Sequence, residues 1–211
     1  MSDLIDVPRG LNGVVAAETA ISDVNGEAGY YQYRGHSAVE LARERSFEDV
    51  WHLLVVGDLP DAAASVAFAE RIAASRTDPR MPELLAAVAN HTDQPLARLR
   101  AVWTLAASVR RSAALYDLGE KDRLGEAIAY AAMAPVALAG GGSASGGGVV
   151  ADYLERVTGV APDAAHVRAL SAYLIAAMDH GFNASTFTAR VIASTGADMA
   201  SCLTGAVGAL S

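Results

Sequence analysis

The sequence predicts a mainly α-helical protein with one β-hairpin near its N-terminus. The chain is rich in alanine, which has the highest helix propensity, and only 6% of its residues are aromatic. Hydrophobic residues make up 52% of the 211 residues and charged residues 19%, a balance typical of a globular protein with a buried core. Packed helices are therefore favoured over a β-sandwich.

The predicted hairpin occupies residues 10–35. Residues 14–24 supply the first strand, Asn25 and Gly26 give the signal of a type I′ turn, and residues 29–34 supply the return strand. We expect no other β structure. An N-terminal segment with this hairpin therefore spans residues 1–36, and a helical region follows.

Several helices are marked by the residues at their N-terminal caps. Ser37 and Glu40 form a capping box, in which each side chain satisfies a free backbone amide of the other residue. Ser46 opens a second short helix that stops at Gly57, and Asp163 opens a later one. Further helices are expected at 61–75, 83–90, 95–116, 122–139, 149–158, 163–179, 184–195 and 198–210.

The helix expected at 163–179 carries a continuous apolar face. Four residues at helical spacing form it: Val167, Leu170, Leu174 and Ile175. Because such a face is normally turned toward the core, we expect it to be buried.

Residues 140–148, with the sequence GGGSASGGG, are predicted to form a flexible linker or surface loop. An engineered replacement for a native loop is the alternative. The segment lacks the lysine of a phosphate loop and matches neither G-x-G-x-x-G nor G-x-S-x-G. A phosphate-binding role is therefore not predicted.

Charge and apolar content exclude several classes of function. The net charge of −8 disfavours nucleic acid or an anionic membrane as a partner, because clustered Lys and Arg bind phosphate groups. The first residues do not form a signal peptide and no run of about 18 apolar residues is present, so we expect a cytoplasmic protein. Cys202 is the single cysteine, which excludes an internal disulfide, and its small neighbours favour a buried structural thiol over a nucleophile.

The five histidines do not predict a metal site. They are His36, His52, His91, His166 and His180, and no two of them have H-x-x-x-H or H-E-x-x-H spacing. His52 follows Trp51 on an apolar helix, where a packed core or interface residue is expected.

The segment 179–196, DHGFNASTFTARVIASTG, is the strongest candidate for a binding site. His180 can donate a hydrogen bond to a substrate oxygen, and Asn183 can offer an amide to the same ligand if the chain turns at Gly181. Asn183 or Ser185 is also a candidate cap for the helix that follows. The alternative is that His180 is only a helix C-terminal residue, stabilised there by the macrodipole.

Four segments follow one another in an order that is typical of a known family. Residues 10–26 (GLNGVVAAETAISDVNG) contain the hairpin signal, and Tyr33-Arg-Gly-His36 precedes a capped helix. Residues 46–54 (SFEDVWHLL) open the next helix, and H-x-x-N-A-S-T lies within 179–196. Together these segments resemble the N-terminal part of a bacterial citrate synthase.

The resemblance implies a fold, a reaction and two site residues. It implies that residues 37–211 form a portion of the multi-helical large domain, ending near the hinge to the small domain. The family condenses acetyl-CoA with oxaloacetate, uses the coenzyme A thioester as a substrate and needs no further cofactor. His180 and Asn183 would bind oxaloacetate. A homodimer is expected, and its candidate surfaces are the helices at 95–116, 163–179 and 184–195.

The resemblance also predicts what this chain lacks. In the family, the segment that matches residues 203–211 runs into G-P-L-H-G-G, and the catalytic histidines, the aspartate base and the arginine clamps lie downstream. No catalytic residue is therefore predicted within this chain, and we expect it to be inactive alone. Two alternatives are a 2-methylcitrate synthase, which uses propionyl-CoA, and a non-catalytic helical module that is either truncated or engineered.

Overall fold

The computed structural model describes residues 13–142, 146–179 and 181–210. Three short strands come first, namely β1 (Ser22–Asn25), β2 (Tyr30–Tyr33) and β3 (His36–Ser37). The helices are α1 (Ala38–Glu44), α2 (Phe47–Val56), α3 (Ala62–Arg76), α4 (Met81–Ala89), α5 (Pro95–Arg110), α6 (Glu120–Ala139), α7 (Val149–Thr158), α8 (Ala164–Ala176), α9 (Ala184–Ser194) and α10 (Met199–Gly208), with a 3₁₀ turn, η2, at Leu115–Asp117. The predicted mainly helical class is confirmed.

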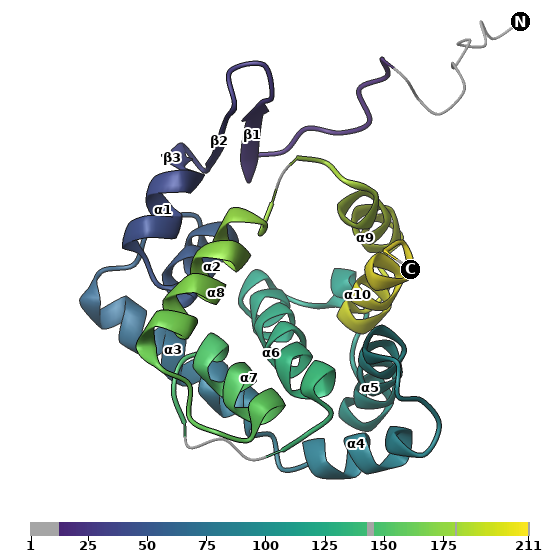
Figure 1. Cartoon of the computed structure of the whole chain (residues 1–211). Coiled ribbons are helices and arrows are strands. Elements are labelled where there is room, and N and C mark those ends of the chain that lie inside the picture. Colours follow the sequence, from purple (N-terminus) through teal and green to yellow (C-terminus); the bar gives the residue numbers. More distant parts are fainter. Residues whose placement is uncertain (1–12, 143–145, 180, 211) are drawn as a thin grey trace, which may run out of the picture.

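Helix α6 lies at the centre of the fold (Figure 1). It packs against α5 and α10 on one side and against α3 and α7 on the other. Its residues Ile128, Ala132 and Met133 are at most 1% exposed. The indole Nε1 of Trp103, on α5, donates a hydrogen bond of 2.8 Å to the carbonyl of Tyr130. The main core is therefore built around α6.

A second core joins the N-terminal sheet to α1, α2 and α8. The three strands pair antiparallel in the order β1-β2-β3. Tyr33 from β2, Leu53 from α2 and Ile175 from α8 are completely buried there. The sheet is thus fastened to the helices through one face of β2.

The sheet corrects the predicted hairpin in three respects. Strand β1 covers four residues rather than eleven, and β3 adds a third strand that was not expected. Asn25 pairs with Tyr30, so four residues connect the strands. A type I′ turn needs positive φ at both central residues, but in this connection only Gly29 has it. The type I′ prediction is therefore wrong.

The observed helix starts agree with the sequence predictions better than the observed helix ends do. The side chains of Ser37, Ser46 and Asp163 each accept a hydrogen bond from a backbone amide in the first turn of their helix. The helix expected at 95–116 ends instead at Arg110. Arg111 takes a left-handed conformation, with φ of 53°, which closes α5 six residues early.

The apolar face predicted on the helix at 163–179 is only partly buried. Ile175 is completely buried, whereas Val167, Leu170 and Leu174 are half-buried, and the two leucines line a groove. Helix α8 packs on α1, α2 and α7, and these neighbours leave the side toward α6 open. The expectation of a buried face is therefore wrong for three of its four residues, Val167, Leu170 and Leu174.

Two single-residue predictions are confirmed. Cys202 is a buried free thiol, and burial raises its pKa, which disfavours the reactive thiolate. His52 is 8% exposed, and its Nδ1 lies 2.9 Å from the carbonyl of Asp58.

Within the described ranges, no helix has both the length and the apolar character needed to cross a membrane.

Substitution of Gly196 by alanine tests the docking of η2. Both Gly196 and Gly159 have positive φ, but a Cβ at Gly196 would lie 2.6 Å from the Tyr116 ring, whereas Gly159 has no atom within 4 Å. We expect Gly159→Ala to lower the free energy of unfolding by about 1–2 kcal/mol for the strained φ. Gly196→Ala should cost a further ~1–2 kcal/mol, because the ring must move and weaken its hydrogen bond to Ser194. Urea unfolding of both variants checks this; equal losses would contradict it.

Candidate substrate-binding site

Strand β2 holds the junction between α8 and α9. The Tyr33 hydroxyl donates a hydrogen bond of 2.7 Å to the carbonyl of Ile175, and the Tyr31 hydroxyl donates one of 2.8 Å to that of Ala176. These carbonyls belong to the last turn of α8, where backbone acceptors lack partners inside the helix. Two segments that are 142 residues apart in the sequence therefore form one structural unit.

Asp179 and Gly181 shape the chain on either side of residue 180. The amide of Asp179 donates to the Tyr33 hydroxyl at 3.2 Å, and its Oδ1 accepts from the amide of Gly181 at 2.8 Å. Gly181 has φ of 105°, which only glycine adopts easily. The turn expected at Gly181 is therefore present. His180 itself lies outside the described residues, so its role stays a prediction.

Asn183 is the N-cap of α9. Its Oδ1 accepts hydrogen bonds from the amide of Thr186 at 2.9 Å and from the Ser185 hydroxyl at 2.6 Å. Of the two caps that the sequence allowed, Asn183 is the one used. Its acceptor is committed to the helix start, which leaves the Nδ2 amino group as the part that can donate to a ligand.

A cavity of about 430 Å³ lies at the start of α9. It is lined by residues 14–17 and by Phe182, Asn183, Ala184 and Phe187. The rings of Phe182 and Phe187 meet edge to face at 5.7 Å, and the Arg190 guanidinium lies over the Phe182 ring at 5.0 Å. Arg190 also donates to the carbonyl of Glu18 at 2.8 Å, which ties α9 to the N-terminal segment. The cavity thus combines an amide donor, an aromatic wall and a nearby cation.

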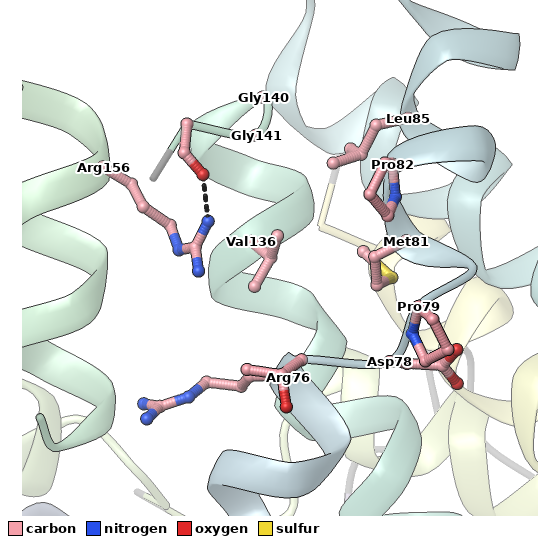
Figure 2. Close-up of a pocket in the computed structure, with 12 residues that line it drawn as sticks. Arg76, Asp78, Pro79, Met81, Pro82, Leu85, Val136, Gly140, Gly141 and Arg156 are labelled. Carbon is pink, nitrogen blue, oxygen red and sulfur yellow. Dashed lines mark hydrogen bonds between the residues drawn. The ribbon is translucent and has the colours of Figure 1, made fainter. Parts of the chain in front are cut away.

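A second cavity, of about 410 Å³, borders the glycine-rich segment (Figure 2). Arg156 donates to the carbonyl of Gly142 and is paired with Asp152 at 2.7 Å. Arg76 donates to the carbonyl of Gly147 at 2.7 Å. Figure 2 shows both guanidinium groups on the same side of this cavity. The two arginines hold backbone carbonyls on either side of residues 143–145, which lie outside the described residues.

Arg76 is an unusual buried cation. It is 5% exposed, and within the described part of the chain its Nε and Nη1 have no hydrogen-bond partner. Burial lowers its pKa, whereas the nearby carboxylates of Asp152 and Glu48 raise it. Since the guanidinium binds the loop backbone, its first role is structural.

A family model described as "Citrate synthase, C-terminal domain" matches residues 10–211. This match covers nearly the whole chain. The chain belongs to the citrate synthase family. The resemblance drawn from four short segments is therefore confirmed. The portion of the family chain that it represents, and the domain division at residues 36 and 37, stay predictions.

Curated citrate synthase relatives match along almost the full chain. A citrate synthase of Haloferax volcanii is 32% identical over 98% of this chain and 58% of its own length. A 2-methylcitrate synthase of Mycobacterium tuberculosis is 36% identical over 97% of this chain and 54% of its own length. The chain therefore spans about half the length of the curated relatives it matches.

Solved citrate synthase structures have the same fold. The enzyme of Thermotoga maritima aligns with a TM-score of 0.79 at 28% identity, covering 96% of this chain and 55% of that one. The enzyme of the archaeon Thermoplasma acidophilum, solved in a ternary complex with carboxymethyl coenzyme A and oxaloacetate, aligns with a TM-score of 0.83 at 19% identity. It covers 94% of this chain and 54% of that one. The predicted citrate synthase-like fold is confirmed.

Sequence reasoning on this citrate synthase relative missed the groups that support the junction. No local pattern marks Tyr31 and Tyr33 as hydrogen-bond donors to the end of α8, or Arg190 as a donor to the N-terminal segment. The only signal in the sequence is that Tyr33 begins the Y-R-G segment, since a tyrosine hydroxyl that becomes buried usually finds a hydrogen-bond partner. Within the described residues, no three His, Cys, Asp or Glu side chains are grouped as metal ligands would be.

Alkaline unfolding tests the Tyr33 anchor. Burial raises the pKa of Tyr33 above its ordinary value, so the folded protein keeps the phenol proton at a pH where the unfolded chain loses it. The neutral, buried phenol of Tyr33 stabilises the folded protein fully below about pH 10. This stabilisation is lost as the pH rises through the raised pKa of Tyr33. We expect the urea midpoint of the unmodified chain to fall between pH 9 and pH 11. Tyr33→Phe should show a smaller fall, because burial raises the pKa of Tyr130 as well and that contribution remains. Identical falls would contradict this.

Proposed function

We propose that this chain supplies the oxaloacetate-binding part of a cytoplasmic acyltransferase that condenses acetyl-CoA with oxaloacetate to give citrate and coenzyme A. The observation that carries the proposal is the H-x-x-N-A-S-T segment of a citrate synthase family member, placed where Asn183 lines a cavity. The Thermoplasma acidophilum enzyme is known in complex with oxaloacetate, which supports this choice of ligand.

The reaction divides into steps that need different groups. A base removes a proton from the acetyl methyl group, and the resulting enol carbon attacks the ketone carbon of oxaloacetate, whose oxygen takes up a proton. Water then cleaves the thioester and releases the coenzyme A thiol. In this proposal His180 donates a hydrogen bond to oxaloacetate and the Nδ2 group of Asn183 donates a second. Neither residue removes the methyl proton.

The proposal is tested with a chimaera in which this chain replaces the 54% of the Mycobacterium tuberculosis 2-methylcitrate synthase that it matches. We expect the chimaera to release the coenzyme A thiol from acetyl-CoA only when oxaloacetate is present. We expect no turnover by this chain alone. His180→Ala should lower kcat/KM by about 10²–10³, the usual cost of losing one donor to a polarised oxygen. His166→Ala is the matched control, because that histidine side chain is 76% exposed in the first turn of α8. A folded chimaera that is unaffected by His180→Ala would refute the role of His180.

Two substitutions of Asn183 distinguish its role in oxaloacetate binding from its role in the stability of α9. Asn183→Asp keeps an oxygen that caps α9 but replaces the Nδ2 donor with a second carboxylate oxygen, which repels a dicarboxylate. In the same chimaera, the KM for oxaloacetate should therefore rise at least tenfold while the melting temperature changes little. Asn183→Ala should lower both stability, by about 1 kcal/mol, and affinity. An unchanged KM in Asn183→Asp would contradict the proposed contact.

A second candidate is 2-methylcitrate synthesis from propionyl-CoA. The observation that favours it is that several relatives carry this description, including one 36% identical to this chain. One methylene is worth about 1–3 kcal/mol of discrimination, or roughly 10- to 200-fold. Chimaeras built on the Haloferax volcanii and the Mycobacterium tuberculosis enzymes separate the candidates. If both chimaeras prefer the same acyl-CoA, this chain determines the preference. If each chimaera prefers the acyl-CoA of its parent enzyme, the residues that determine the preference lie in the parent's part.

We further propose that the family member functions as a homodimer. Apolar side chains on two of the predicted surfaces support this: Leu105 and Val109 on α5 are 37% and 55% exposed, and Val191 on α9 is 48% exposed. Exposed apolar surface of this kind favours association. Gel filtration of the chimaera should give a dimer, and a monomer at micromolar concentration would contradict the proposal.

A further inference from the structure

Helix α9, which is capped by Asn183, has α10 as its main packing partner (Figure 1). Thr188 and Ile192, one turn apart, face Gly205 of α10, and a Cβ atom on that glycine would overlap the Ile192 side chain. None of the eleven residues of α9 is buried. The position of this helix therefore also depends on what its other face contacts.

That other face carries Asn183, Phe187 and Arg190, which have the spacing i, i+4, i+7. Asn183 and Phe187 line the cavity at the start of α9, whereas Arg190 lies one turn beyond and does not line it. The Arg190 guanidinium stacks over the Phe182 ring at 5.0 Å, and its Nη1 donates a hydrogen bond of 2.8 Å to the carbonyl of Glu18. One side chain thus contacts elements on both sides of the cavity.

The wall opposite α9 consists of residues 14–17, which form neither a helix nor a strand. Val14 and Val15 in this wall are 41% and 85% exposed. Within the described parts of the chain, the hydrogen bond from Arg190 to Glu18 is the one that joins residues 14–19 to another element. A segment with so few contacts opens locally at a small cost in free energy. The contact with Arg190 therefore decides how firmly this wall is held.

We propose that Arg190 is a positioning residue for oxaloacetate binding. It fixes the ring of Phe182, the residue next to Asn183 in the chain, and through Glu18 it holds the opposite wall. A guanidinium suits both tasks, because its planar face stacks on a ring while its edge donates hydrogen bonds. Arg190 acts through these groups and does not touch the ligand. The inference rests on the proposed function, in which Asn183 binds oxaloacetate.

The first test compares arginine variants in the Mycobacterium tuberculosis chimaera. Arg190→Ala should raise the KM for oxaloacetate about tenfold and leave kcat within about twofold, because the loss weakens ground-state and transition-state binding equally. Arg190→Lys keeps a cation over the ring and a donor for Glu18, so it should raise KM no more than about threefold. Arg168→Ala is the matched control, since Arg168 is exposed on α8 and does not line the cavity. A loss of melting temperature and kcat with an unchanged KM would overturn the proposal.

A double-mutant cycle with Asn183→Asp distinguishes positioning from direct contact. Once the Nδ2 donor of Asn183 is gone, Arg190 has less to position, so Arg190→Ala should raise KM by less than about threefold in that background. The two substitutions are therefore expected to be non-additive. An equal, about tenfold, effect of Arg190→Ala in both backgrounds would mean that Arg190 contacts oxaloacetate itself, which would overturn the proposal.

A measurement without ligand keeps this proposal separate from the catalytic one. A nitroxide label at Val15→Cys in this chain reports the motion of residues 14–17, because Cys202 is the single native cysteine and is 4% exposed. Arg190→Ala should narrow the electron paramagnetic resonance lines of the label, and Arg168→Ala should not. Equal line widths in the presence and absence of Arg190 would overturn the proposal, whether or not the chimaera turns over. If Asn183→Asp leaves KM unchanged, the oxaloacetate contact fails, and the label still decides whether Arg190 holds the wall.

Discussion

Helix α6 can be stable only if other helices bury it. From Ala127 to Ala139 this helix contains no charged residue, and a helix that is apolar all round is stable only when other elements cover it. Helices α3, α5, α7 and α10 cover most of its circumference. Tyr130 adds a polar group to this interior, and its hydroxyl lies 2.5 Å from the Ser112 hydroxyl. The remaining side of α6 forms a wall of the apolar groove between α2, α6, α7 and α8.

The candidate site depends on a second, local constraint. Helix α8 must end where its last carbonyls find donors, and the two tyrosine hydroxyls of β2 provide them. The turn through Asp179 and Gly181 then leads directly to Asn183, which starts α9. The N-terminal sheet therefore sets the geometry of a segment near residue 180 without being close to it in the sequence.

The sequence predicted what depends on neighbouring residues and failed where distant contacts decide. The caps at Ser46, Asp163 and Asn183 were predictable because a side chain and an amide two or three residues away suffice. The end of α5 was not, because nothing in the local pattern indicates the left-handed conformation of Arg111. The site segment was found through its motif, but the tyrosines that fix it become visible only when β2 meets α8.

The half-buried leucines of α8 show the same limit of local sequence patterns. Periodicity places Leu174 on an apolar stripe of α8, but it does not state which surface covers that stripe. The half-buried leucines thus become informative because the sequence pattern and the packing disagree there.

We propose that the junction of α8 and α9 binds oxaloacetate through Asn183. The most direct measurement is a crystal structure of the Mycobacterium tuberculosis chimaera with oxaloacetate bound. We expect an oxaloacetate oxygen to lie within about 3.2 Å of Asn183 Nδ2, while Oδ1 still caps α9. Oxaloacetate bound at another place, or bound here with Asn183 turned away, would show that Asn183 does not bind it.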